Sequence, residues 1–219
     1  MQIYPMFGRF LNLGLLMLVA ACVGPPKGRS ADTAPRKPPA VVNENIKQCV
    51  GELDRLGTRY TAIPDRSLGG GCSNIGTVQL LGVGVPITNV TAIRCPLARA
   101  LALWTRETLQ PAARDAFGSR VVKIESMGGY SCRNMIGGRG AGRSEHATGN
   151  AVDIGAFVLA DGRRVSIRQG WNGIDDERLF LRQIRGAACK RFQTVLSPDY
   201  NAAHFDHLHF DLGGKPFCR

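Results

Sequence analysis

Histidine is scarce in this sequence, and several familiar metal and redox motifs are missing from it. Only four of the 219 residues are histidine. The chain lacks the His-Glu-x-x-His pattern of many zinc proteases, and no two cysteines stand in Cys-x-x-Cys spacing. The sequence therefore does not indicate a zinc protease of that pattern, a cysteine zinc site or a dithiol redox centre.

Acidic residues are outnumbered by basic ones. The chain has 28 lysines and arginines against 17 aspartates and glutamates, which gives a formal net charge of +11. No nucleic-acid-binding module and no pattern of stacked aromatic and basic residues accompanies this charge, so we expect no nucleic-acid partner. An anionic wall polymer or membrane headgroups are a better match for a basic surface. A well-charged soluble surface with no such partner is an equally good explanation.

The beginning of the chain has the features of an export signal. The apolar run Leu11–Ala21 is shorter than the roughly 20 residues that a bilayer-spanning helix requires, and it ends in small residues before Cys22. This ending resembles a bacterial lipobox. The resemblance implies a signal peptide over residues 1–21, acylation of Cys22, and a lipoprotein that is attached to the cell envelope and faces the periplasm. Val23 is compatible with sorting to an outer membrane, and a plain signal peptide or a retained anchor helix are the alternatives.

Residues 22–41 are rich in glycine, proline and basic residues. Such a segment buries little apolar surface and prefers extended conformations, so we expect a flexible tether. The remaining residues, 42–219, have an ordinary globular composition and a length that suits one domain.

The periodicity of apolar residues in this domain predicts an α+β fold, with a mainly antiparallel sheet and helices packed to one side. Asp161-Gly162 between two strand patterns is typical of a hairpin turn. The glycine-rich residues 137–142 lack the flanking strand and helix of a nucleotide-binding loop, so we expect a loop beside the candidate site. Helices are expected over 42–57, 96–110 and 175–189, and strands over 77–93, 121–126, 151–159, 163–168, 192–196 and 207–212.

The cysteines predict a chain that is cross-linked by disulfides in an oxidising compartment. Setting Cys22 aside leaves six cysteines, and an even number in an exported chain favours up to three disulfides, each worth roughly 2–4 kcal/mol. The sequence does not choose among the many possible pairings. We expect a bond between Cys72 and Cys95, which bracket the glycine-rich strands. The six candidates are Cys49, Cys72, Cys95, Cys132, Cys189 and Cys218.

All the histidines fall into two short segments, around His146 and around His209. A single histidine is more often a hydrogen-bonded structural residue than a ligand, but this concentration calls for another explanation. Gly149 permits a tight turn after His146, and the alternation that follows puts Asp153 inside a strand, from which a neighbouring strand could bring His209 to the same point. Two imidazoles and a carboxylate form a common catalytic zinc set that leaves one position for water. We therefore predict that His146, Asp153 and His209 bind Zn²⁺.

These two segments also carry a resemblance. Ser-x-His-x-x-Gly-x-Ala-x-Asp, followed late in the chain by Asp-His-x-His, resembles the zinc peptidases of bacterial cell-wall metabolism, which include D-Ala-D-Ala carboxypeptidases and lysostaphin-like endopeptidases. More narrowly, residues 129–133, 143–154 and 196–204 resemble the bacterial extensin-like C-terminal domain family. The resemblance covers about residues 49–219 and implies the zinc D-Ala-D-Ala peptidase fold, which the Hedgehog signalling domain shares, with Zn²⁺ as cofactor and peptidoglycan as substrate. The repetitive proline-rich composition of a plant extensin is absent.

The resemblance further implies catalytic roles for Asp206 and His207. Asp206 stands three residues before the expected ligand His209, where the related carboxypeptidases carry a catalytic glutamate, and its shorter side chain puts its reach in question. We expect Asp206 to act as the general base and His207 to stabilise the tetrahedral oxyanion. The alternative, in which His207 takes part in the proton transfer, stays open.

Arg133 and Ser144 match positions that in the dipeptide-cleaving relatives hold the terminal carboxylate of the substrate. Arginine suits this role because its planar guanidinium can bind a carboxylate through two hydrogen bonds. A surface arginine and a turn serine are the alternatives. We expect His204 and Glu145 to support the site or the structure.

The sequence thus leads to an envelope-anchored zinc metallopeptidase that hydrolyses peptide bonds of peptidoglycan stem peptides or cross-links, as a carboxypeptidase or an endopeptidase. The alternative is a non-catalytic, metal-containing lipoprotein that binds the cell wall, because a fold alone does not establish an activity. The bond that is cleaved and the oligomeric state are left open by the sequence.

Overall fold

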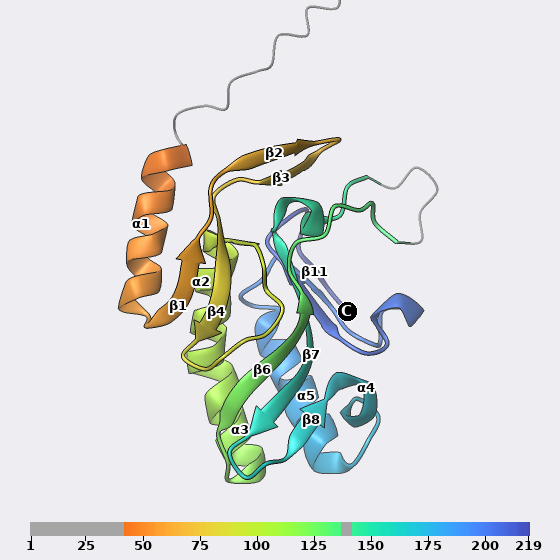
Figure 1. Cartoon of the computed structure of the whole chain (residues 1–219). Helices are drawn as coiled ribbons and strands as arrows, with labels where there is room; N and C mark the ends of the chain where they lie inside the picture. Colours follow the sequence, from red (N-terminus) through yellow and green to blue (C-terminus); the bar gives the residue numbers. More distant parts are fainter. Residues whose placement is uncertain (1–41, 137–141) are drawn as a thin grey trace, which may run out of the picture. The chain divides into compact units, whose positions relative to one another are not determined.

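The computed structural model describes residues 42–136 and 142–219 (Figure 1). The predicted signal peptide, the predicted lipidation of Cys22 and the tether lie outside these residues, as does most of the glycine-rich loop predicted over 137–142. Among the helices of the described residues, none has the length and apolar character needed to cross a bilayer.

The predicted helices are present, and one of them runs further than expected. Helix α2 is followed without a break by the π-helical turn η1 and by α3, so the helix expected to end near residue 110 continues to Phe117. Pro111 lacks the N–H of a regular helix, but it lies in the first turn of α3, directly after the wider π-helical turn, and does not end the helix there. The helical elements are α1 (Val42–Arg55), α2 (Cys95–Trp104), η1 (Thr105–Leu109), α3 (Gln110–Phe117), η2 (Glu145–Thr148), α4 (Ile167–Gly170), α5 (Asp175–Ala188) and η3 (Ala202–His204).

The strands of the described residues form separate sheets. β1 (Thr58–Ala62), β4 (Thr77–Val83) and β5 (Ile93–Arg94) form one, and β2 (Arg66–Gly69) and β3 (Cys72–Asn74) form a hairpin. The largest sheet has the order β11-β9-β10-β7-β6, with β8 paired to β7, and it is antiparallel except for the β11–β9 pair. Its strands are β6 (Val121–Gly128), β7 (Ala151–Leu159), β8 (Arg164–Ser166), β9 (Thr194–Leu196), β10 (Leu208–Asp211) and β11 (Phe217–Cys218).

The hairpin expected across Asp161-Gly162 is present as the β7–β8 pair, in which Phe157 lies opposite Val165. The second strand of this hairpin ends at Ser166, and α4 begins where the sequence predicted a strand up to residue 168. The Ser166 hydroxyl accepts a hydrogen bond from the Gln169 N–H and so caps this short helix.

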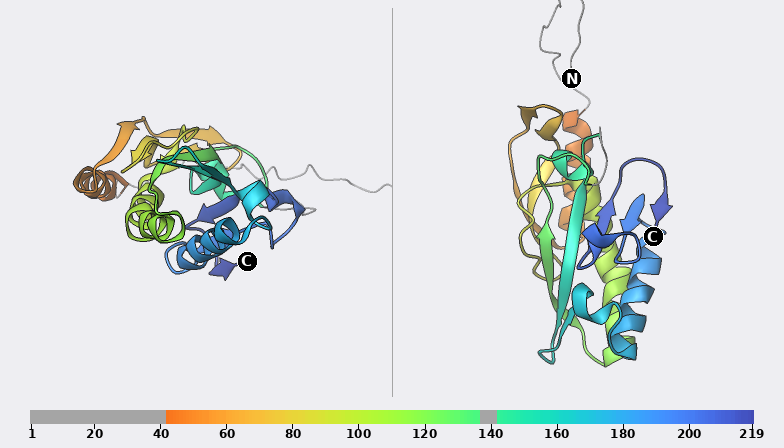
Figure 2. Two further views of the ribbon diagram at one scale, coloured as in Figure 1. Left: turned by 90° about the horizontal axis from the view of Figure 1, so that it is seen from below. Right: turned by 90° about the vertical axis from the view of Figure 1, so that its right-hand side faces the viewer.

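Helices α2 and α5 pack against one side of the largest sheet (Figure 2). The ring of Trp104 in α2 lies 5.2 Å from that of Phe210 in β10 and 6.3 Å from that of Phe157 in β7, measured between centroids. Phe180 in α5 lies 5.8 Å from Phe157. Burying each such ring stabilises the fold by about 1.5–3 kcal/mol. The α+β class with helices packed to one side is therefore confirmed.

Three disulfides join Cys49 to Cys95, Cys72 to Cys132, and Cys189 to Cys218. The expected bond between Cys72 and Cys95 is wrong. Cys95 begins α2, which packs along α1 and there meets Cys49. Cys72 lies instead in the β2–β3 hairpin, which reaches the segment that follows β6 and so meets Cys132.

Candidate metal centre

A short turn before β7 holds His146. The turn η2 begins after Ser144, whose hydroxyl accepts a hydrogen bond from the His146 N–H at 3.4 Å. It ends at Gly149, which adopts a left-handed conformation with φ of 66°. A side chain at this position would be strained by that conformation and would also meet Thr77 at 3.0 Å. His146 is thereby held at the N-terminal end of β7 with only 2% of its surface exposed.

Asp153 and His209 reach the same point because they are direct partners across two strands. The antiparallel β7–β10 pair places His209 opposite Asp153 in its register. On either side of Asp153, Val152 and Ile154 are fully buried in the core, so the carboxylate points to the other face of the sheet. The alternation predicted for this strand is therefore present around Asp153, and it delivers both side chains to one face.

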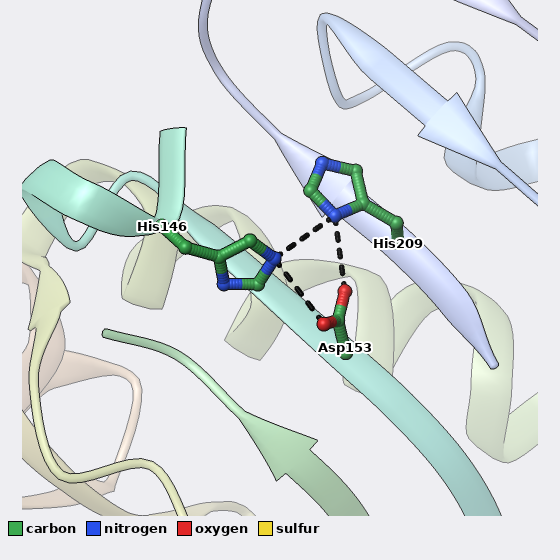
Figure 3. A group of neighbouring side chains, drawn as sticks. All are labelled: His146, Asp153 and His209. Atoms are coloured by element: carbon green, nitrogen blue, oxygen red, sulfur yellow. Dashed lines mark hydrogen bonds and ion pairs between the residues drawn. The ribbon is translucent and has the colours of Figure 1, made fainter. Parts of the chain in front are cut away.

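The side chains of His146, Asp153 and His209 converge (Figure 3). His146 Nε2 lies 3.2 Å from Asp153 Oδ2 and 3.2 Å from His209 Nδ1, and His209 Nδ1 lies 3.0 Å from Asp153 Oδ1. A tetrahedral zinc ion with bonds of about 2.1 Å holds its ligand atoms about 3.4 Å apart. The three donor groups therefore have both the chemistry and the spacing that such an ion requires.

Each imidazole is oriented by a hydrogen-bond acceptor at the ring nitrogen that faces away from the cluster. His209 Nε2 donates to Asp211 Oδ2 at 2.9 Å, and His146 Nδ1 donates to the carbonyl of Gly129. A neutral imidazole that donates from one nitrogen presents the lone pair of the other, so His209 Nδ1 and His146 Nε2 are left as ligand atoms. Asp211 is 5% exposed and its second oxygen accepts the Gly213 N–H at 2.9 Å, which orients the carboxylate.

Sequence reasoning missed both of these acceptors. Asp211 follows His209 by two residues on one strand and so shares its face, and that spacing could have identified it. Gly129 contributes a backbone carbonyl, for which the sequence carries no side-chain signal.

Neighbouring groups shift the pKa values of Asp153 and His209 in opposite directions. Burial raises the pKa of Asp153, but hydrogen bonds from His146 and His209 lower it more, to well below its usual range. Burial lowers the pKa of His209, but hydrogen bonds to Asp153 and Asp211 raise it more, to about 9. A proton on His209 thus offsets part of the negative charge of Asp153 and Asp211, and a divalent cation bound in the same place would displace that proton.

His207 lies at the edge of this cluster, with Asp206 behind it. His207 Nε2 is 3.7 Å from Asp153 Oδ1, while its Nδ1 hydrogen bonds Asp206 Oδ1 at 2.9 Å. The two residues precede β10, so they are not bound by the alternation of a regular strand. Asp206 therefore contacts the metal-site side chains through the ring of His207.

The family model described as extensin-like protein C-terminus matches residues 47–219. The chain belongs to this family. A comparison with curated proteins gave no match, and neither did a comparison with solved structures. The matched part of the extensin-like chain includes every residue of the candidate metal centre and all six cysteines of the disulfides.

In the extensin-like domain, the segment that carries Arg133 is attached to the metal-site turn at several points. The Ser144 N–H donates to the Arg133 carbonyl at 3.2 Å, and the Ser131 N–H donates to the His146 carbonyl at 3.0 Å. The disulfide of Cys132 holds the same segment to the β2–β3 hairpin. Arg133 and Ser144, which the resemblance assigns to substrate binding, are thus brought beside His146.

The two residues expected to have supporting roles take part in local contacts. His204 Nδ1 hydrogen bonds Asn201 Oδ1 at 2.7 Å, and burial together with His207, His209 and Arg133 lowers the pKa of His204 to about 4. Its ring is therefore neutral near pH 7. The Glu145 carboxylate accepts the Asn150 amide at 2.7 Å and fills the space that a side chain at position 213 would need.

Proposed function

We propose that the extensin-like domain is a zinc-dependent peptidase that hydrolyses peptide bonds of peptidoglycan stem peptides or cross-links. The observation that supports this proposal is the spacing of His146 Nε2, His209 Nδ1 and the Asp153 carboxylate, combined with the acceptors that orient both rings. When bound, Zn²⁺ supplies a water whose pKa is lowered to about 7 and polarises the scissile carbonyl. The motif spacing and the antiparallel β7–β10 pair also support a relationship to the D-Ala-D-Ala peptidase fold.

His207 is the group best positioned to move protons. Its Nδ1–H donates to Asp206, so its Nε2 is free to take a proton from the attacking water and to pass it to the leaving amine. Asp206 orients the ring and stabilises its protonated form. This division differs from the one that the resemblance implies, because the carboxylate of Asp206 lies behind the ring and not at the cluster.

Arg133 is the proposed partner of a carboxylate at the end of the substrate. Its positive charge acts on the pKa of His204, which lies beside His207 with ring centroids 5.0 Å apart. The Ser144 hydroxyl already accepts the His146 N–H and retains its own proton to donate to a substrate. If both residues bind a terminal carboxylate, the enzyme is a carboxypeptidase.

An exported, envelope-anchored location is part of the same proposal. The three disulfides favour an oxidising compartment such as the periplasm, and the signal-like residues 1–21 and Cys22 supply the expected anchor.

The test is to incubate the purified protein with peptidoglycan, with and without a chelator, and to measure released or trimmed muropeptides. We expect release that the chelator abolishes and that zinc restores. His146→Ala is the matched variant, and it should lose both bound metal and activity. Bound metal without cleavage of any stem peptide would support the alternative, a wall-binding lipoprotein.

A further inference from the structure

A groove opens beside the metal centre on the same face of the largest sheet. Its volume of about 550 Å³ is within the range of small-ligand sites. Gly155 lines the groove from β7, two residues beyond Asp153 on the same face of that strand, and Asp206 lines it from the segment before β10. The groove therefore continues from the site where the proposed chemistry takes place.

The lining of the groove is polar and carries both signs of charge. Arg164, Arg168, Glu125 and Asp206 all border it. Arg164 forms an ion pair of 2.8 Å with Glu125, whose other oxygen binds Lys123 at 2.7 Å, so the Glu125 carboxylate is already occupied. Arg168 forms no ion pair with any described residue, and Asp206 is engaged only through Oδ1, by His207. One cation and one carboxylate oxygen are thus left to face a ligand.

The unpaired cation and the carboxylate border the same groove, and Phe205 contacts the first and precedes the second in the chain. The guanidinium carbon of Arg168 lies 5.3 Å from the centroid of the Phe205 ring, and Phe205 directly precedes Asp206 in the chain. Phe205 is 49% exposed, so its ring is a surface platform for the guanidinium and not a core residue. The cation–π contact orients the guanidinium without using its hydrogen-bond donors.

We propose that this groove binds a zwitterionic group, an ammonium and a carboxylate on one carbon, at the end of a substrate side chain. Arg168 binds the carboxylate and Asp206 Oδ2 binds the ammonium. The free end of a diaminopimelate residue in a wall peptide has this chemistry, whereas a lysine in its place has only the ammonium. The inference rests on the proposed function, since it takes the stem peptide as the substrate.

A pair of ligands that differ by one carboxylate tests the inference. The probes are acetylated stem tripeptides with meso-diaminopimelate or with lysine as the third residue, titrated calorimetrically into the full-length, zinc-loaded protein. A charge-assisted hydrogen bond between the Arg168 guanidinium and a carboxylate is stronger than a bond between neutral groups, so we expect the diaminopimelate peptide to bind roughly tenfold more tightly. Arg168→Gln should remove this difference and leave the affinity for the lysine peptide unchanged.

Arg178→Gln is the control, because Arg178 lies on α5, pairs with Asp175 and does not line the groove. It should keep the full preference. Equal affinity of the wild type for the two peptides, no detectable binding of either, or a preference that survives Arg168→Gln would each overturn the inference. A preference in binding without cleavage of peptidoglycan would reject the peptidase and retain the groove. Cleavage of peptidoglycan without a preference in binding would reject the role of the groove and retain the peptidase.

Discussion

Replacing Asp211 with asparagine is expected to weaken zinc binding while leaving the fold intact. In the wild type, one oxygen of Asp211 accepts from His209 Nε2 and the other from the Gly213 N–H, both at 2.9 Å. Asparagine has the same shape but only one acceptor oxygen, which the Gly213 N–H takes. The amide NH₂ then faces His209 Nε2, and the ring proton moves to Nδ1, the nitrogen that faces Asp153.

The size of this effect follows from the loss of one orienting partner. Removing the hydrogen-bond acceptor behind a metal-binding histidine typically costs about 10–100-fold in metal affinity, which corresponds to about 1.4–2.7 kcal/mol. Asp211 is buried, so water does not readily replace the missing acceptor. We therefore expect a zinc dissociation constant for Asp211→Asn that is about 10–100-fold higher than that of the wild type.

Competition against a chromophoric chelator near neutral pH measures this difference. Asp199→Asn is the matched control, because Asp199 hydrogen bonds Trp171 Nε1 at 2.8 Å and takes no part in the metal centre. It should bind zinc as the wild type does. A folded Asp211→Asn protein with wild-type zinc affinity would refute the idea that Asp211 sets the tautomer of His209.

Three further predictions concern catalysis, pH and the disulfides. His207→Ala should lower turnover of peptidoglycan by about 10²–10⁴-fold with zinc content unchanged, and Asp206→Asn should lower it less, as measured by muropeptide release and metal analysis. In metal-free protein, the free energy of unfolding should fall as the pH rises from about 6.5 to about 9, because hydrogen bonds to Asp153 and Asp211 raise the pKa of His209 to about 9 and the stability that they contribute is lost as the ring deprotonates. Denaturant unfolding with chelator present measures this decline. Replacing Cys72 and Cys132 together with serine should lower the free energy of unfolding by about 2–4 kcal/mol and weaken zinc binding, because the bond holds the segment that supports His146.

Each of these predictions has a clear contrary result. Loss of zinc from His207→Ala would make His207 a ligand and not a proton carrier. A stability that does not change between about pH 6.5 and 9 would mean that no proton on His209 balances the carboxylates. Cys189→Ser with Cys218→Ser is the control for the disulfide, since this bond joins α5 to β11, and equal losses of zinc affinity in both double variants would contradict the specific role of Cys72–Cys132.

The convergence of the three proposed ligands could be predicted because it depends on strand geometry. The alternation around Asp153 fixed the face on which its side chain lies, and His209 needed only a neighbouring strand in register. The Asp161-Gly162 turn likewise carried enough local information to predict its hairpin. The direction of each side chain and the hairpin turn depend on a few adjacent residues, whereas the pairing of β7 with β10 joins segments that are far apart in the chain.

The features that the sequence did not predict depend on contacts between distant segments. The partner of Cys95 is decided by the packing of α2 on α1, and apolar periodicity does not contain that information. The same limit applies to the division of the strands into separate sheets, because alternation identifies a strand but not its neighbour. The position of Asp206 behind His207 arises because both residues precede the regular strand, where alternation gives no direction.

The direct pairing of Asp153 with His209 makes an ion at this site sensitive to how the two strands align. A slip of a single residue between β7 and β10 would turn one member of the pair into the core and separate the donors. If the site binds zinc as proposed, the bound ion would favour the native register over a shifted one. Such an ion would thus stabilise the pairing of two strands that are distant in the sequence, in addition to any part it takes in catalysis.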